Sequence, residues 1–247
     1  MGGRMTGFQR LIGIVVSPSQ TFADIDRRPT WILPVILMLL SNFAVTFVVY
    51  RVLVTDSNFN QIAETRLHWD ADSSGKPMSS ASVKLQTESL RRQRERWYLL
   101  PPYAVFVSTL GMSGFFYLVL RITRTDISLK KVFVVVCWSF VIYRVVGGVF
   151  VIAALLMRGP ANFFPAAPES WSPTSLAHLI SRATVSPNVY SAVSKLDVFL
   201  VWWLAVMAVG FAKTAKNLTI LKSAIIVTVC EVVYLILNAA GTLPGIS

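Results

Sequence analysis

The sequence has 247 residues and is unusually apolar, with 54% hydrophobic and only 14% charged residues. Globular domains carry roughly 25% charged residues, so this composition argues against a water-soluble domain and for a chain solvated by lipid. The formal net charge is +11. Because the basic residues flank apolar blocks, they favour anionic lipid headgroups as partners and argue against nucleic acid.

An apolar stripe at helical spacing comes first in the chain, formed by Phe8, Leu11, Ile12, Val15 and Val16. Such a stripe is typical of an amphipathic helix. It either anchors the N-terminus on the membrane or provides a docking surface for a cytoplasmic partner, and both interpretations stay open here.

The next segment has the form of a helix start. Residues 17–20 fit a capping box, with Ser17 as the N-cap and Pro18 at the first helical position. Phe22 and Ile25 then share one face, so the predicted helix can lie in the membrane interface with its apolar side down.

Five later apolar runs are long enough to cross a hydrocarbon core of roughly 30 Å. The predicted fold is therefore all-α: a polytopic membrane protein with about five transmembrane helices in a bundle, preceded by N-terminal interfacial amphipathic helices in residues 1–30. The bundle occupies residues 31–247, with spans near 31–54, 99–120, 132–157, 196–212 and 220–240 and polar loops at 55–96 and 158–195.

The distribution of basic residues predicts the orientation of the chain. Cytoplasmic segments next to spans carry an excess of Lys and Arg. With five spans, the most basic segments share one side, so we expect a cytoplasmic N-terminus and a C-terminus outside. These residues are Arg4, Arg10, Arg27, Arg28, Arg121, Arg124, Lys130, Lys131, Lys213, Lys216 and Lys222.

Two charged residues fall inside predicted spans. Arg144 lies about 18 Å from the start of the third span and Glu231 about 16 Å from the start of the fifth. Because an arginine at the bilayer centre costs about 2.5–3.5 kcal/mol, we predict that the two form a pair inside the bundle. Asn42, Tyr143 or Tyr234 would add hydrogen bonds. The pair either clasps helices together or marks a route for a substrate or proton.

No pattern in the sequence indicates catalysis. His68 and His178 are the only histidines, and neither has a metal ligand at the required spacing. Cys137 and Cys230 both fall within apolar blocks. The sequence lacks a nucleophile elbow, a P-loop and a dinucleotide fingerprint. We therefore predict a protein that is not an enzyme and uses no cofactor or metal.

The segment before the first span carries a pattern formed by Ser17, Pro18, Thr21, Phe22, Ile25, Pro29, Trp31 and Pro34. With this pattern the chain resembles the YIP domain family, in particular its bacterial branch. The resemblance implies a five-helix bundle with a cytoplasmic N-terminus. Eukaryotic relatives are associated with Rab GTPases and vesicle formation, whereas bacterial members lack an assigned activity. This chain has almost no cytoplasmic domain and a long polar loop after the first span.

We therefore expect an adaptor or membrane-organising protein without enzymatic activity, in a bacterial cytoplasmic membrane. Its expected partners are the lipid bilayer, including anionic lipids, and an unidentified membrane or cytoplasmic protein, and self-association stays open. The alternative is a small transporter or channel subunit centred on Arg144 and Glu231.

Overall fold

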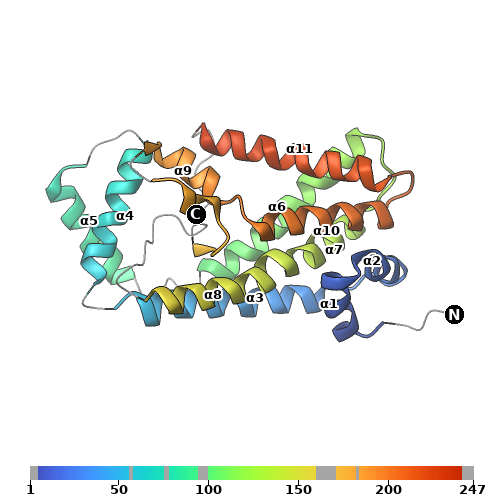
Figure 1. The fold of residues 1–247 in the computed structure, drawn as a ribbon, viewed down its shortest axis with the longest axis horizontal. Coiled ribbons are helices and arrows are strands. Elements are labelled where there is room, and N and C mark those ends of the chain that lie inside the picture. Colours follow the sequence, from blue (N-terminus) through green and yellow to red (C-terminus); the bar gives the residue numbers. More distant parts are fainter. Residues whose placement is uncertain are drawn as a thin grey trace. The chain divides into compact units, whose positions relative to one another are not determined.

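The structure, a computed structural model, describes residues 5–55, 58–74, 78–93, 100–159, 171–181 and 184–240. All regular elements in these residues are helical, which confirms the predicted all-α class (Figure 1). The chain divides into two compact units. The first comprises residues 1–42, 102–148 and 199–231, and the second comprises residues 43–101, 149–198 and 232–247.

The described helices include four that are long and apolar enough to cross a membrane: Ile32–Leu53, Tyr103–Ile122, Leu129–Arg158 and Ile220–Leu237. A fifth span results if Pro187–Ser194 and Val198–Thr214 are taken together across the break between them. In each of the four, no more than 33% of the most apolar window is buried within the protein. Outward apolar surfaces of this extent need acyl chains as solvent. The protein is therefore an integral multi-pass membrane protein.

Helix α7 (Leu129–Phe140) lies at the centre of the first unit, and all its residues from Val134 to Phe140 are buried. A helix that is apolar all round is expected to be enclosed by others. The other elements of this unit are α1 (Gly7–Val16), α2 (Pro18–Arg27), the start of α3 (Ile32–Phe47), α6 (Leu100–Ile122), the π-helical η3 (Val141–Val146), α10 (Val198–Thr214) and most of α11 (Ile220–Ala239).

Two short turns connect α6 to α7 and α10 to α11. Each contains a residue in the left-handed region, Arg124 with φ 58° and Asn217 with φ 62°. The Lys216 backbone N–H donates to the Asp126 carbonyl over 3.1 Å, so the two turns lie side by side. The basic residues of both turns are thereby brought to one end of the unit.

The second unit shows that the predicted polar loop 55–96 contains two helices, α4 (Phe59–Ser74) and α5 (Ser80–Gln93), which pack side by side (Figure 1). Helix α4 ends at Ser74 and α5 begins at Ser80. Although polar overall, α4 has a buried stripe every fourth residue, and such a stripe stabilises a helix by packing. The stripe consists of Phe59, Ala63, Leu67 and Ala71.

The same unit contains the π-helical η1 (Val48–Leu53), most of α8 (Gly147–Arg158), the short 3₁₀ helix η6 (Leu176–Leu179) and α9 (Pro187–Ser194). Val49, Leu53 and Leu155 form its main apolar cluster with residues of α4. Ser175 Oγ donates to the Ser194 carbonyl over 2.8 Å, and this bond ties η6 to the end of α9.

Candidate functional site

Helices α1 and α2, which we call the N-terminal hairpin, follow each other almost without a linker. Helix α1 begins with a reciprocal capping box: Gln9 N donates to Thr6 Oγ1 over 3.2 Å, and Thr6 N donates to Gln9 Oε1 over 2.8 Å. Helix α2 begins at Pro18, as predicted. However, the predicted capping box at residues 17–20 is wrong, because the Ser17 side chain makes no cap bond. Ser17 instead closes α1, with its backbone N–H on the Gly13 carbonyl at 2.8 Å.

The two helices of the hairpin approach closely where a glycine faces a threonine. A Cβ atom on Gly13 would collide with Thr21 Oγ1. Thr21 is fully buried, and its hydroxyl donates to the Ser17 carbonyl over 3.1 Å. A glycine is therefore needed at position 13 for α1 and α2 to pack at this distance.

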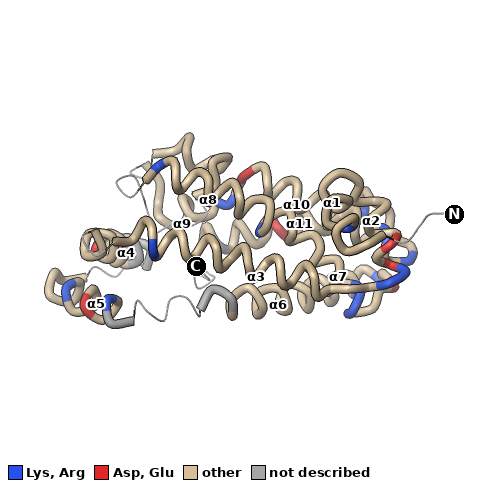
Figure 2. The backbone as a smooth tube through the Cα atoms, turned by 90° about the horizontal axis from the view of Figure 1, so that it is seen from below, with Lys and Arg blue, Asp and Glu red and all other residues tan. Residues whose placement is uncertain are grey.

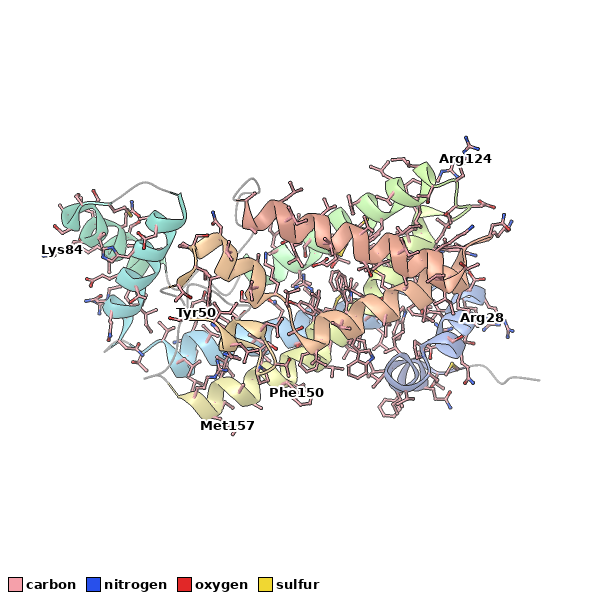
Figure 3. The ribbon with its side chains drawn as sticks, turned by 45° about the horizontal axis from the view of Figure 1, so that its top comes forward. Arg28, Tyr50, Lys84, Arg124, Phe150 and Met157 are labelled. Atoms are coloured by element: carbon pink, nitrogen blue, oxygen red, sulfur yellow. The ribbon has the colours of Figure 1, made fainter. Side chains whose placement is uncertain are left out.

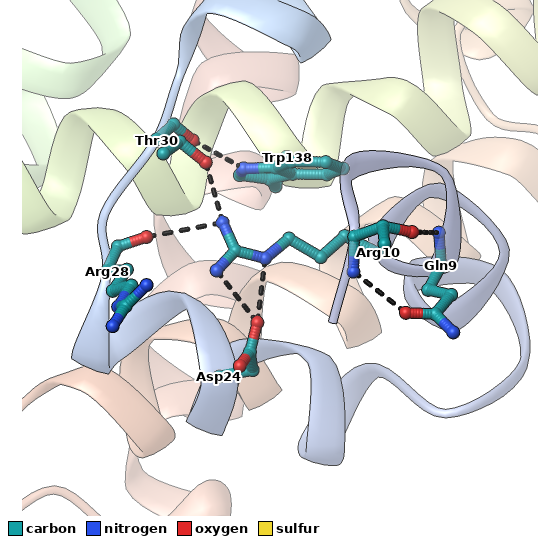
Figure 4. A network of polar contacts seen from close by, with 7 residues as sticks. Gln9, Arg10, Asp24, Arg28, Thr30 and Trp138 are labelled. Atoms are coloured by element: carbon teal, nitrogen blue, oxygen red, sulfur yellow. Dashed lines mark hydrogen bonds and ion pairs between the residues drawn. The ribbon is translucent and has the colours of Figure 1, made fainter. Parts of the chain in front are cut away.

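Arg10 lies on the inner side of the hairpin and is 5% exposed. Its Nε donates to Asp24 Oδ2 over 2.8 Å, and its Nη2 lies 2.7 Å from the same oxygen (Figure 4). Its Nη1 donates to Thr30 Oγ1 over 2.6 Å and to the Arg28 carbonyl over 3.2 Å. Trp138 Nε1 of α7 donates to the Thr30 carbonyl over 2.7 Å, which extends the network into the bundle. Arg10 is the one charged residue within α1, and the sequence pattern indicated for it only a part in the orientation of the chain.

The hairpin is packed against the transmembrane helices through α2. Phe22 is fully buried, and its ring lies 2.8 Å from the position that a Cβ on Gly210 of α10 would occupy. Asp26 Oδ1 forms an ion pair with Lys131 Nζ of α7 at 2.6 Å. Ile25 is also buried. The apolar face of α2 therefore contacts protein, and the lipid contact predicted for Phe22 and Ile25 is not what the structure shows.

The eight residues of the family pattern support this docking. Ser17, Pro18, Thr21, Phe22 and Ile25 form the helix junction and the buried face of α2. After α2, Trp31 contacts the Phe133 ring edge-on at 5.8 Å and Pro34 is buried at the start of α3. Pro29, two residues before Trp31, is half-buried.

The outer side of the hairpin is exposed. Phe8, Ile12 and Val16 of α1 are 69%, 49% and 72% exposed. On α2, Gln20, Ala23 and Arg27 are exposed. The hairpin therefore presents an apolar face on α1 and a polar face on α2.

A second polar centre surrounds Arg144 in the π-helical segment η3. Its Nη2 donates to Ser108 Oγ of α6 over 3.1 Å, and its guanidinium carbon lies 4.9 Å from the centre of the Phe140 ring. Ser41 Oγ of α3 donates to the Arg144 backbone carbonyl over 2.7 Å. Arg144 is near the middle of the 30-residue helix Leu129–Arg158. π-helical turns inside longer helices often mark functional sites.

Arg144 Nε is buried and lacks a hydrogen-bond partner among the described residues, and the same holds for Oδ1 of Asn42, the residue after Ser41 on α3. The Phe140 ring stacks on Trp203 at 5.2 Å, and Tyr143 contacts the same tryptophan at 6.0 Å. Aromatic side chains of α7, η3 and α10 therefore pack against one another.

The other predicted members of this centre have different positions. Glu231 lies on α11 in the first unit and is half-buried, and its ion pair with Arg144 stays a prediction. Tyr234 belongs to the second unit, where its hydroxyl accepts from Lys195 Nζ over 3.1 Å.

The fold and the hairpin together define a class: a polytopic helical membrane protein whose N-terminal helices are docked on its transmembrane bundle. The Yip1 domain family model matches residues 12–241, from within α1 to the end of α11, so the chain belongs to this family. This confirms the resemblance to the YIP domain family, while the assignment to its bacterial branch stays a prediction. The family is not known as an enzyme family. No curated protein and no solved structure matches the chain.

Proposed function

We propose that this protein is a membrane adaptor of the Yip1 type, without enzymatic activity, that binds a partner through the outer side of its N-terminal hairpin on the cytoplasmic side. The observation that supports this proposal is the division of the hairpin into two sides. Its inner side is occupied by Arg10, Thr21 and Phe22 in packing and hydrogen bonds. Its outer side is exposed yet held in one orientation.

The polar outer face of α2 is the part we assign to a protein partner. Gln20 and Ala23 are exposed there, while Phe22 and Ile25 hold the helix on the bundle. A rigid surface lowers the entropy cost of association, so such a face can bind without first folding.

Crosslinking and affinity capture from native membranes test this proposal. We expect the intact chain to capture a partner that a chain lacking residues 1–28 does not. Ala23→Trp should also abolish capture, because it places a large ring on the outer face and leaves the buried residues unchanged. Ala81→Trp is the matched control, since Ala81 is an exposed helical alanine on α5 of the second unit. Equal capture by the intact and truncated chains would assign binding to the bundle instead.

A second candidate function, a small transporter or channel subunit, is favoured by buried atoms of Arg144 and Asn42 that have no hydrogen-bond partner in the described residues. Buried Arg144 Nε and Asn42 Oδ1 could line a hydrated path, since intramembrane polar groups often mark such routes. Reaction of Asn42→Cys with a membrane-impermeant thiol reagent would support this function. Protection of that cysteine from both sides of the membrane would favour the adaptor.

A further inference from the structure

Helix α1 has an apolar stripe that the rest of the described chain leaves exposed. Phe8, Ile12 and Val16 are spaced four residues apart and therefore lie one above another on the outer side. On the opposite side, Arg10 is fixed by Asp24, the Arg28 carbonyl and Thr30. Because these contacts hold α1 in one rotation about its axis, the stripe faces away from the bundle.

The same unit carries more cations than its carboxylates neutralise. Residues 5–31, 121–131 and 213–222 contain ten Lys and Arg but only three Asp. Each of the three carboxylates is in an ion pair, with Arg10, Lys131 and Lys216 as partners. Arg121 lies over the Tyr117 ring at 6.0 Å. The other six are exposed and, in the described residues, have no carboxylate partner: Arg27, Arg28, Arg124, Lys130, Lys213 and Lys222.

These cations lie at the ends of the membrane-spanning helices. Lys130 is the second residue of α7 and Lys222 the third of α11. Figure 2 shows Lys and Arg gathered at the end of the unit where α1 and α2 lie, and in Figure 3 the Arg28 and Arg124 side chains point away from the helices. The positions next to the spans place these side chains at the level of the lipid headgroups.

We propose that the outer stripe of α1 and these six cations together form a binding surface for anionic phospholipids, with Phe8, Ile12 and Val16 among the upper acyl chains. This inference rests on the proposed function, because it names the bilayer as the partner of the α1 side of the hairpin. Each cation near an anionic surface is worth about 1 kcal/mol, which is about fivefold in binding. A bilayer supplies both apolar and anionic groups at this level, whereas a protein partner would need an acidic rim around an apolar groove.

Site-specific fluorescence in nanodiscs tests the position of α1. The full chain, with Cys137 and Cys230 replaced by alanine, carries an environment-sensitive dye at Ile12→Cys. The matched control carries it at Gln20→Cys on the polar face of α2. We expect nitroxide-labelled lipids to quench the dye at residue 12 but not at residue 20. An unquenched dye at residue 12, or protection of it only by an added soluble protein, would overturn the proposal.

The contribution of the six cations is measured separately, by the retention of anionic lipid. We expect the wild-type protein in mixed phosphatidylcholine and phosphatidylglycerol nanodiscs to retain phosphatidylglycerol on detergent extraction, as measured by native mass spectrometry. Replacing Arg28, Lys213 and Lys222 by glutamine should reduce that preference by about fivefold per charge. An unchanged preference would contradict the anionic specificity. Because Ala23 takes no part in this surface, lipid binding can persist when partner capture fails, so the two proposals fail separately.

Discussion

Arg10 in the N-terminal hairpin and Arg144 in the third long helix both contact residues of other elements through their guanidinium groups, but the contacts differ. Arg10 has a carboxylate, a carbonyl and a hydroxyl as acceptors. The contacts that the structure defines for the Arg144 guanidinium are a serine hydroxyl and an aromatic ring, both neutral. Arg10 therefore holds α1 and α2 together. Arg144, in contrast, has a buried Nε donor without a hydrogen-bond partner in the described residues.

Two segments of similar local sequence lie at different positions along their membrane-spanning helices. The segments Phe47–Leu53 and Phe140–Val146 share Phe-Val-x-Tyr-Arg-Val, and both contain a π-helical turn. Arg51 is exposed and only two residues from the end of its span, so it can extend to the headgroups. Arg144 is too far from either end to do so. Similar sequences therefore give the same backbone form, and depth decides the surroundings of the arginine.

The largest effect is expected at the predicted pair of Arg144 and Glu231. Arg144→Glu would place two carboxylates in the span region, which should cost more than the roughly 3–5 kcal/mol of breaking a buried pair. Adding Glu231→Arg should restore folded protein, with a coupling free energy of about 1–3 kcal/mol. The yield of monodisperse protein in detergent measures both. If the double exchange restores nothing, the two side chains are not paired.

Removal of the Arg10 partner should come next. Asp24→Ala leaves a buried guanidinium without its counter-charge and should cost about 3–5 kcal/mol in the free energy of unfolding. Asp26→Ala is the control, because its pair with Lys131 is about one-third exposed at both side chains and should cost less than about 1 kcal/mol. Equal losses in thermal unfolding would show that Arg10 does not fix the hairpin.

A change in helix packing should have a smaller effect. A side chain at Gly210 would meet Phe22 at 2.8 Å and Val135 at 2.7 Å, so Gly210→Val should destabilise the protein by about 1–3 kcal/mol through overpacking. Gly111→Val on α6 is the matched control, because a Cβ there has nothing within 4 Å. Thermal unfolding of both variants separates docking of the hairpin from the general effect of replacing a helical glycine.

The smallest effects should separate the two Tyr-Arg turns. Ser108→Ala removes a hydrogen bond to the Arg144 guanidinium and should cost about 1.5 kcal/mol, the lower end for a hydrogen bond to a charged group. Arg51→Gln should cost less than about 1 kcal/mol, since that side chain is exposed. A loss for Arg51→Gln as large as that for Ser108→Ala would argue that depth does not distinguish the two turns.

The membrane class and the helical fold were predictable because they follow from long apolar runs, which are visible in the sequence without knowledge of any tertiary contact. The start of α2 at Pro18 was predictable from local chemistry. Helix α4 was not predicted, because its polar composition concealed the stripe from Phe59 to Ala71. That stripe, at four-residue spacing, is the signal that could have identified α4.

Less of the candidate site could be predicted, because it depends on contacts between distant segments. Thr30 and Trp138 are 108 positions apart, and no periodicity connects them. Phe22 and Ile25 can be buried against lipid or against protein, and the sequence pattern is the same in both cases. Gly210 and Lys131 decide in favour of protein, but neither residue is distinctive by itself in the sequence.

Hydrogen exchange in nanodiscs is the most direct test of whether the N-terminal hairpin is docked on the bundle. We expect the backbone amides of Thr21, Phe22 and Ile25 to exchange as slowly as those of the buried helix α7, and to lose that protection in Gly210→Val. Rapid exchange of these three amides in the wild-type protein, at the rate of a helix lying freely on the membrane surface, would contradict the docked hairpin.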